Sequence, residues 1–363
     1  MGLSTALIKT LPDSFIESAG RRYLAGNNLV EGIDNICRLY EQFGYFASFD
    51  IVGEDASTTA EANDTVNYYL EAIDMIAKRF DFGKHSHQKP VSISVKPSAI
   101  CLVYKKPDKV VFDSKTPLQQ QLGLIAKVAG DKGIDITLDM EDHRYTDQSL
   151  EALRSLWSAG YNNLGGVLQS SLNRTEADLW RIAEKAASER RGLVPRIHRA
   201  ALGESYRARR IRLCRGIYSE PKEIATPSKK EAKSRLCKEV GILLDYDLYL
   251  EIATHDQKLI QEIEINHLWG RDKTKSEFQF LLGVPVAEKV LAPRLFQEGY
   301  TVRFYTPVKI RDNGTKYMRR RLIESPGMVL DGVCASLLGG KPLVERLDKK
   351  NYLGQIIIPS PSE

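Results

Sequence analysis

Short apolar runs recur along the chain from Tyr45 onwards, and stretches with the period of a helix lie between most of them. Eight of these runs have the length and the content of β-branched and aromatic residues that are typical of strands. The eight runs are Tyr45–Val52, Val91–Val95, Ile134–Leu138, Leu164–Leu168, Ile211–Cys214, Tyr249–Ala253, Phe278–Leu282 and Thr301–Tyr305. The helical stretches include Ala60–Arg79, Pro117–Ala129, Asp147–Ala159 and Thr175–Ala187. This alternation predicts parallel βα units.

Eight is the number of strands that closes a (βα)8 barrel, which is the fold that we expect. A doubly wound open sheet is the alternative, but no Gly-x-Gly-x-x-Gly motif follows any of the runs. Nearly every run is followed by a polar side chain that is capable of chemistry. These side chains are Glu54, Lys96, Asp139, Glu141, Gln169, Arg212, Tyr218, Thr254, His255, Asp256, Gln279 and Tyr305. The carboxyl ends of barrel strands meet at one mouth, so we expect an active site there.

Different segments flank the repeated units. Residues 12–44 carry apolar positions at helical spacing, so we expect an N-terminal helical segment over 1–44. This segment would pack on a barrel formed by residues 45–330. The end of the chain is polar and contains two prolines among its last five residues, so we expect 331–363 to be a partly disordered C-terminal extension.

The composition is that of a soluble globular protein. Of the 363 residues, 42% are apolar or aromatic and 27% are charged. The net charge of +5 is too small to imply a nucleic-acid partner by itself. The first eleven residues hold too short an apolar run for a signal peptide, and no apolar run is long enough to span a membrane. We expect a cytoplasmic protein, and peripheral contact with the inner face of the cell membrane stays open.

The cysteines and acidic residues argue against a metal site. The five cysteines are scattered, odd in number and without a Cys-x-x-Cys pair. Such usage is typical of a reducing compartment and indicates neither a disulfide framework nor a zinc site. Asp139 and Glu141 resemble a pair of metal ligands, but no third ligand lies at a suitable spacing, so we expect no metal.

The segment Gly192–Arg210 is basic, and it is long for a connection between a helix and a strand. We expect a solvated insertion here, although an extra helix is also compatible with the sequence. A patch that binds nucleic acid or a membrane surface is the other interpretation. A binding or regulatory protein that uses the stretch Arg190–Arg212 is therefore one alternative to an enzyme.

The stretch from Tyr305 to Arg321 carries the clearest chemical signal, and it predicts the end of a strand followed by a helix. On that helix, Tyr317, Arg320, Arg321 and Glu324 fall on one narrow face. A guanidinium matches a carboxylate through two parallel hydrogen bonds. Two adjacent arginines beside an aromatic ring therefore predict a clamp for a small carboxylate. The alternative is a solvated helix surface, which is the usual place for a run of charges.

Nine short motifs together give the chain a resemblance to a known family. They are Ile51–Glu54, Val91–Ser98, Ile136–Glu141, Gly166–Gln169, Ile211–Tyr218, Ala253–Asp256, Glu277–Gly283, Val302–Val308 and Tyr317–Glu324. The order of these motifs resembles that in the proline dehydrogenases, and so does the distance of fifteen residues from Tyr305 to Arg320. These are flavin-dependent (βα)8 enzymes.

The resemblance implies an activity and a cofactor. FAD would lie across the mouth of the barrel and would accept hydride from L-proline, giving Δ1-pyrroline-5-carboxylate. This is the first step of proline catabolism to glutamate, and the electrons would pass to a quinone or another carrier. A lyase or aldolase-type barrel enzyme that acts on a small carboxylate without flavin is the alternative enzyme. The sequence predicts neither the electron acceptor nor the oligomeric state.

The resemblance also implies roles for individual residues. The catalytic set would be Lys96, Asp139, Tyr305, Arg320 and Arg321, with the two arginines paired to the substrate carboxylate. The substrate ring would lie against Tyr218, Leu281, Tyr305 and Tyr317. The residues that would hold the flavin are Gln169, Arg212, Gly216, Thr254, His255 and Glu324, with Arg212 near flavin atom N5.

The chain departs from the family pattern at three places. Lys309 stands where the family usually has glycine, and Cys214 and Arg215 stand where it tends to have valine and lysine. The basic segment before Arg212 is longer than usual. These departures concern the lid of the pocket and the adenine end of the flavin, and they leave the arginine pair intact.

Overall fold

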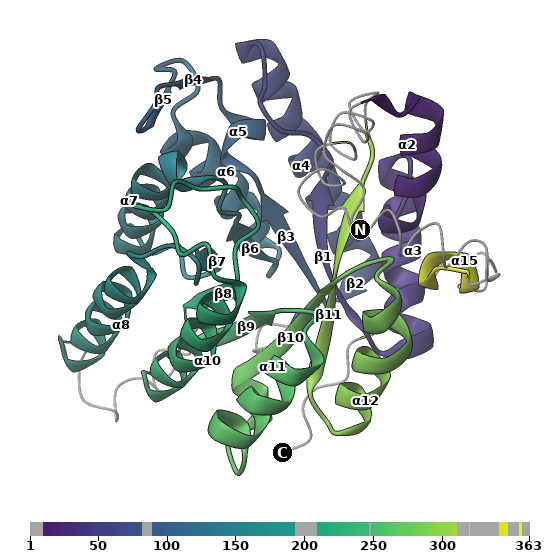
Figure 1. Cartoon of the computed structure of the whole chain (residues 1–363). Coiled ribbons are helices and arrows are strands. Elements are labelled where there is room, and N and C mark those ends of the chain that lie inside the picture. The colour runs from purple at the N-terminus through teal and green to yellow at the C-terminus, as the bar shows by residue number, and fades with distance from the viewer. Residues whose placement is uncertain are drawn as a thin grey trace.

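Eight parallel strands close into a barrel with helices around the outside (Figure 1). This computed structural model describes residues 10–81, 89–192, 209–246, 248–310, 319, 341–347 and 356–357. The strands follow one another around the barrel in the order β1-β11-β10-β9-β8-β7-β6-β3. Their bounds are β1 Phe46–Ile51, β3 Val91–Val95, β6 Asp135–Leu138, β7 Leu164–Gln169, β8 Arg210–Cys214, β9 Tyr249–Ala253, β10 Ser276–Leu281 and β11 Thr301–Val308. All eight predicted strands and the predicted barrel are confirmed.

Helices separate the strands along the chain, as the sequence predicts. The longer helices are α2 Asp13–Gly20, α3 Leu29–Phe43, α4 Thr59–Arg79, α6 Leu118–Asp131, α7 His143–Ser158, α8 Thr175–Gly192, α10 Lys229–Asp245, α11 Gln257–Ile263 and α12 Ala292–Gln297. The shorter helical turns are η1 Arg21–Tyr23, α5 Pro97–Ile100, η2 Glu264–Leu268, η3 Lys273–Lys275, η4 Ala287–Leu291 and α15 Leu343–Arg346. Two small sheets complete the fold: β4 Val103–Lys105 pairs with β5 Val110–Phe112, and β2 Phe80–Asp81 pairs with β12 Ile356–Ile357.

Helix α3 shows how the N-terminal segment is attached to the barrel. The Asn28 side chain accepts a hydrogen bond from Glu31 N and so caps the first turn. The helix ends at Gly44, whose φ of +70° favours glycine. Its apolar face, which includes Ile33 and Ile36, is buried in the core against β1 and β11. Helices α2 and α3 thus precede the first strand of the barrel, and the predicted bounds of the N-terminal segment stay a prediction.

The interior of the barrel carries buried charges. Arg303 on β11 is fully buried and donates to both carboxylate oxygens of Glu277, at 2.6 and 3.0 Å. Arg210 on β8 donates to Glu251 at 2.8 Å and lies 3.4 Å from Glu277. Tyr249 donates to the same Glu277 carboxylate at 2.8 Å. These contacts link four neighbouring strands through side chains as well as through the backbone.

The buried charges correct one expectation from the sequence. Arg210 belongs to β8 and is only 4% exposed, so it is not part of a solvated insertion. Arg212 is buried in the same strand and faces other barrel residues. Neither arginine is available to a surface patch for nucleic acid or membrane. The alternation of the strand places both side chains inside the barrel, and residues 193–208 lie outside the described part of the chain.

Much of the predicted C-terminal extension over 331–363 also lies outside the described residues. Within it, Leu343 N donates to the buried Glu288 at 2.9 Å, which attaches α15 to the body of the protein. Strand β12 pairs with β2 near the end of α4. Among the helices that the structure describes, none is long and apolar enough to cross a membrane.

Candidate active site

Four predicted site residues meet in one buried cluster at the carboxyl ends of the strands. Lys96 follows β3, Asp139 follows β6, and Arg212 and Tyr305 lie on β8 and β11. The Lys96 Nζ donates to the Tyr305 hydroxyl at 2.8 Å, and this hydroxyl donates to Asp139 Oδ2 at 2.7 Å. Arg212 Nη1 donates to Asp139 Oδ1 at 2.6 Å. Residues that are far apart in the sequence thus form one hydrogen-bonded group.

Opposite charges keep Asp139 and Arg212 ionised. Burial alone would raise the pKa of Asp139, but the positive charges of Lys96 and Arg212 outweigh burial and lower it. Burial would lower the pKa of Arg212, yet Asp139 and Glu251 raise it. Arg212 Nε also donates to Gln279 Oε1 at 2.6 Å, so the guanidinium is held on two sides. The Arg212 guanidinium is therefore fixed in place and stays charged, paired with the carboxylates of Asp139 and Glu251.

A cavity of about 470 Å³ lies against this cluster, which we call the mouth cavity. Its wall is partly apolar, through Val167, Ile217, Leu281 and Val284. Apolar walls with a few converging polar groups are typical of sites that bind small molecules. The predicted site residues that line it are Lys96, Asp139, Gln169, Arg212, Tyr218, His255, Leu281 and Tyr305.

His255 is a neutral part of this wall. Its Nε2 accepts a hydrogen bond from Leu281 N at 2.9 Å, which ties the end of β9 to the end of β10. Burial lowers the pKa of His255 to about 4, so the imidazole is uncharged at neutral pH. Thr254 lies in the turn before α11, where its hydroxyl accepts from Asp256 N at 3.2 Å. It is not one of the described residues that line the cavity, so its predicted role at the flavin stays a prediction.

Gly216 lies where a larger residue would not fit. Its φ is +94°, and a Cβ atom there would come within 2.3 Å of Ser171 Oγ. Gly216 lines a second hollow of about 530 Å³ that shares Arg215, Ile217 and Tyr218 with the mouth cavity. We call this the side hollow.

The side hollow has features that suit phosphate groups. Ser228 and Lys229, at the N-terminus of α10, form part of its lining together with Arg215. The backbone N–H groups at the start of a helix attract anions, and the side chains of Arg215 and Lys229 add positive charge. A long ligand could occupy both spaces, with its polar end in the side hollow.

Glu141 has a different role from the one that its spacing suggests. Its carboxylate accepts from Ser98 N at 3.0 Å and from Ser98 Oγ at 2.6 Å, and its carbonyl accepts from the Gln169 amide at 2.8 Å. Burial, together with Glu54, raises the pKa of Glu141 to about 7. In the described ranges, no group of three or more His, Cys, Asp and Glu side chains could hold a metal ion. Glu141 instead connects the ends of three strands.

Sequence reasoning missed the polar residues behind the cluster. Asp50 on β1 is fully buried and accepts from Lys96 Nζ at 2.5 Å. Ser94 on β3 donates to Asp139 Oδ1 at 2.9 Å. One sequence pattern could have indicated them: polar residues at every second position of an otherwise apolar strand, as at Ser48 and Asp50, predict polar side chains on one face of that strand.

The predicted carboxylate clamp lies outside the described residues. Tyr317, Arg320, Arg321 and Glu324 all belong to that part of the chain, so their roles stay predictions. The neighbouring Arg319 is described, and it donates to Leu11 O at 2.8 Å and to Asp13 at 2.6 Å.

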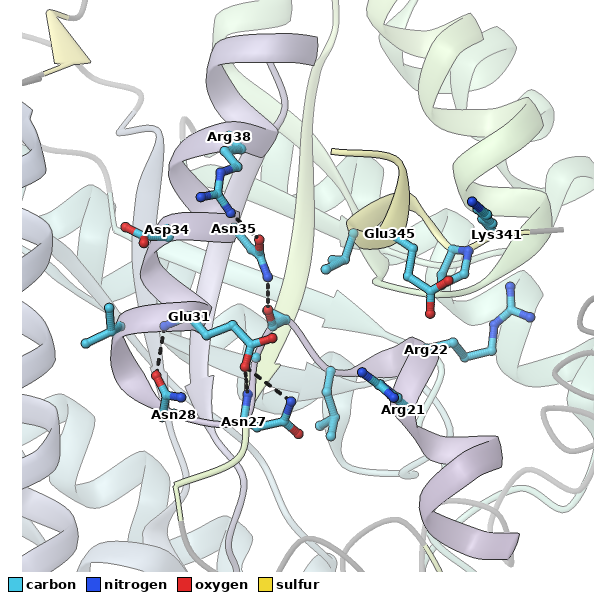
Figure 2. A pocket seen from close by; sticks show the side chains of 16 residues that line it. Arg21, Arg22, Asn27, Asn28, Glu31, Asp34, Asn35, Arg38, Lys341 and Glu345 are labelled. Atoms are coloured by element: carbon cyan, nitrogen blue, oxygen red, sulfur yellow. Dashed lines mark hydrogen bonds between the residues drawn. The ribbon is translucent and has the colours of Figure 1, made fainter. Parts of the chain in front are cut away.

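A larger cavity of about 830 Å³ lies between η1, α3 and the region of α15 (Figure 2). Two of its acidic side chains already have structural partners: Glu31 accepts from Asn27 N at 2.9 Å, and Asp34 pairs with Arg79. Of the predicted site residues that the structure describes, none lines this cavity. The mouth cavity is therefore the better candidate for an active site, although it is smaller.

Comparisons with known proteins point to one family. A family profile described as proline dehydrogenase matches residues 33–328. "Proline dehydrogenase 1" of Bacillus subtilis subsp. natto is 27% identical over 328 residues, covering 86% of this chain and 90% of that protein. "Proline dehydrogenase" of Deinococcus radiodurans is 30% identical over 315 residues, covering 84% of this chain and 86% of that protein.

Solved structures show the same fold. A crystal structure of proline utilization A (PutA) from Bdellovibrio bacteriovorus, inactivated by N-propargylglycine, aligns with a TM-score of 0.70 at 21% identity. The alignment covers 85% of this chain and 33% of that longer protein. The profile match extends over the whole barrel and includes every strand that carries the buried cluster. The chain belongs to the proline dehydrogenase family.

Proposed function

We propose that the protein oxidises L-proline to Δ1-pyrroline-5-carboxylate with FAD as the hydride acceptor. The observation that carries the proposal is the buried cluster of Lys96, Asp139, Arg212 and Tyr305 beside a partly apolar cavity at the barrel mouth. Family membership gives this geometry its chemical meaning. Residues 45–330 would form the catalytic unit.

The residues at the mouth fit a flavin dinucleotide. The mouth cavity offers Gln169 and Arg212 to a polar ring system, and its apolar wall suits the faces of the ring. The side hollow offers Arg215, Lys229 and the N-terminus of α10 to a diphosphate. Gly216 keeps the backbone free of a side chain between the two spaces. When bound, FAD would supply the two-electron acceptor that no side chain can provide.

The residues of the chain would supply orientation and electrostatics. We propose that Arg320 and Arg321 grip the substrate carboxylate, while Tyr218, Leu281, Tyr305 and Tyr317 enclose the pyrrolidine ring and exclude water. Arg212 holds a fixed positive charge beside the cavity, which favours a ligand that gains negative charge there. We further propose that His255 and Thr254 support the flavin from the end of β9. Glu324 would support it from the predicted helix that carries Arg320 and Arg321.

Electrons from proline need an acceptor, and we propose a quinone or another carrier. We also propose that the enzyme works in the cytoplasm, with peripheral contact to the inner face of the cell membrane if the acceptor is a membrane quinone. The four cysteines that the structure describes are free thiols, which supports a reducing compartment.

A visible spectrum tests the cofactor and the substrate together. The purified protein is expected to be yellow, and anaerobic addition of L-proline is expected to bleach the flavin absorbance. A colourless protein, or a flavin that proline does not reduce, would contradict the proposal. A lyase without flavin would give the first of these results.

The clamp has its own test with a matched control. Arg320→Ala or Arg321→Ala is expected to cost about 2–5 kcal/mol of transition-state binding, measured from kcat/KM for L-proline, because a buried charge pair would be lost. Arg319→Ala removes an adjacent guanidinium that contacts Asp13 instead, and is expected to leave kcat/KM nearly unchanged. Unchanged proline kinetics in both clamp variants would refute the assignment.

A further inference from the structure

Asp50 lies behind the mouth cavity and contacts side chains that line it. It is on β1, is fully buried, and is not one of the described residues that line the cavity. Its Oδ1 accepts a hydrogen bond from Lys96 Nζ at 2.5 Å, and Lys96 does line the cavity. Asp50 can therefore act on a bound ligand through the Lys96 ammonium.

Three oxygen atoms surround the Lys96 ammonium, which has three hydrogens to donate. They are Asp50 Oδ1 at 2.5 Å, the Tyr305 hydroxyl at 2.8 Å and Asp139 Oδ2 at 3.5 Å. Only 3% of the Lys96 side chain is exposed. A lysine side chain normally has many rotamers, so this arrangement fixes a flexible group in one place.

Of the two carboxylates beside Lys96, Asp50 is the nearer one. Asp139 is engaged by Arg212 at 2.6 Å and by the Tyr305 hydroxyl at 2.7 Å. That leaves Asp50 as the carboxylate closest to Lys96. A buried ammonium is costly without such a partner.

The titratable groups that face Asp50 come from four elements. They are Lys96 after β3, Asp139 after β6, Tyr305 on β11 and Tyr69 on α4. Burial raises the pKa of Asp50 to about 6; Lys96 opposes this rise and Asp139 adds to it. Burial also raises the pKa of Tyr69, which stays neutral and donates to Ser94 O at 3.0 Å. Asp50 is therefore ionised at neutral pH.

We propose that Asp50 is a positioning residue that holds the Lys96 ammonium in the wall of the mouth cavity, so that a substrate amine bound beside it is favoured in its neutral form. A fixed positive charge disfavours a second cation nearby. The inference rests on the proposed function, because the proline amine must be neutral before hydride leaves the adjacent carbon. Without the negative charge of Asp50, the buried lysine loses its proton or turns away from the cavity.

The kinetic test compares Asp50→Asn with Asp135→Asn. Asp135 is also a buried strand carboxylate, and it lies 3.5 Å from Arg210 at the opposite end of β6 from Asp139. In Asp50→Asn, the acid limb of kcat for L-proline, which reports the enzyme–substrate complex, is expected to move to higher pH by about one unit, a tenfold loss of kcat on that limb. In Asp135→Asn the limb is expected to stay in place. An unmoved limb in folded Asp50→Asn, or the same movement in both variants, would overturn the proposal.

A second measurement does not depend on the reaction. Brief labelling with acetic anhydride modifies neutral lysine amines, and mass spectrometry of peptides measures the labelling of Lys96 alone. Lys96 is expected to react several-fold faster in Asp50→Asn than in the wild type or in Asp135→Asn. Equal labelling in all three proteins would overturn the role of Asp50. If proline fails to reduce the wild-type flavin while the labelling differs as expected, only the proposed function fails.

Discussion

Replacing Arg303 by methionine is expected to lower the free energy of unfolding by about 3–5 kcal/mol, because it leaves a buried carboxylate without its main partner. Arg303 is fully buried and donates to both oxygens of Glu277. It also donates to the carbonyls of Ala47 and Lys89, each at 2.8 Å, and both lose this donor in the variant. Methionine fills a similar volume, so the loss measures polar contacts more than a cavity.

The pKa of Glu277 gives an independent estimate of the magnitude. Burial would raise this pKa, but Arg303 and Arg210 outweigh burial and lower it from 4.5 to about 2. Since each pKa unit corresponds to about 1.36 kcal/mol, the ionised Glu277 in its surroundings contributes about 3 kcal/mol, net of its burial, above pH 4.5. A lowered pKa means that this contribution is lost as the pH falls from 4.5 towards 2. The variant is expected to show a smaller loss over the same range.

Urea unfolding at pH 7, followed by circular dichroism, provides the measurement. The control is Arg271→Met, which breaks an ion pair of similar length: Arg271 lies 2.7 Å from Asp245, but the two side chains are 44% and 62% exposed. Exposed pairs contribute about 0–1 kcal/mol. If both variants lost the same small amount of stability, burial would not be what makes the Arg303 pair strong, and the reasoning would be refuted.

Two further predictions concern the mouth of the barrel. Gly216→Ala is expected to purify with much less flavin absorbance, because the new Cβ meets Ser171. The control is Gly160→Ala, which has a similar φ of +93° but nothing within 4 Å of its Cβ, and it is expected to keep the wild-type flavin content. Equal flavin content in the two variants would contradict the steric argument. His255 stays neutral in the folded state, so the free energy of unfolding is expected to fall as the pH drops from 6.5 to about 4, by up to about 3 kcal/mol from this group alone. His255→Gln is expected to lack this part of the acid sensitivity, and a variant with the full pH dependence would show that another group is responsible.

The strands of the barrel were predictable because their apolar runs are short and regularly separated by helices. The small sheet of β4 and β5 could also have been predicted, because Pro107-Asp108 is a turn signal between them. These two strands are short and partly exposed, so their own pattern is weak. The pairing of β2 with β12 could not have been predicted, because strands of two residues leave no periodic pattern in the sequence. Such pairing depends on the folded structure around it.

Within the site, the sequence predicted the residues at the strand ends but not the ones behind them. Asp50 stands inside the run FASFDI, where one acidic residue resembles an ordinary interruption. Its importance comes from Lys96, which is 46 residues away, and only the pairing of β1 with β3 brings them together. Arg210 was misplaced for a related reason: it adjoins a basic segment, and only the strand register puts it inside the barrel.

The barrel closes between its first and last strands, and this affects how the chain folds during synthesis. Ser48 on β1 is paired with Tyr305 on β11, and the Thr306 hydroxyl bonds to Ser48 O at 2.9 Å. At roughly 5–20 residues per second, a ribosome needs about 12–50 seconds to make the chain between these partners. During that interval one edge of β1 has no neighbour, and the growing chain is open to the wrong pairing or to a chaperone. Closure must wait until the C-terminal part of the barrel has left the ribosome, so a truncation that removes β11 would leave the whole ring open and not merely one strand shorter.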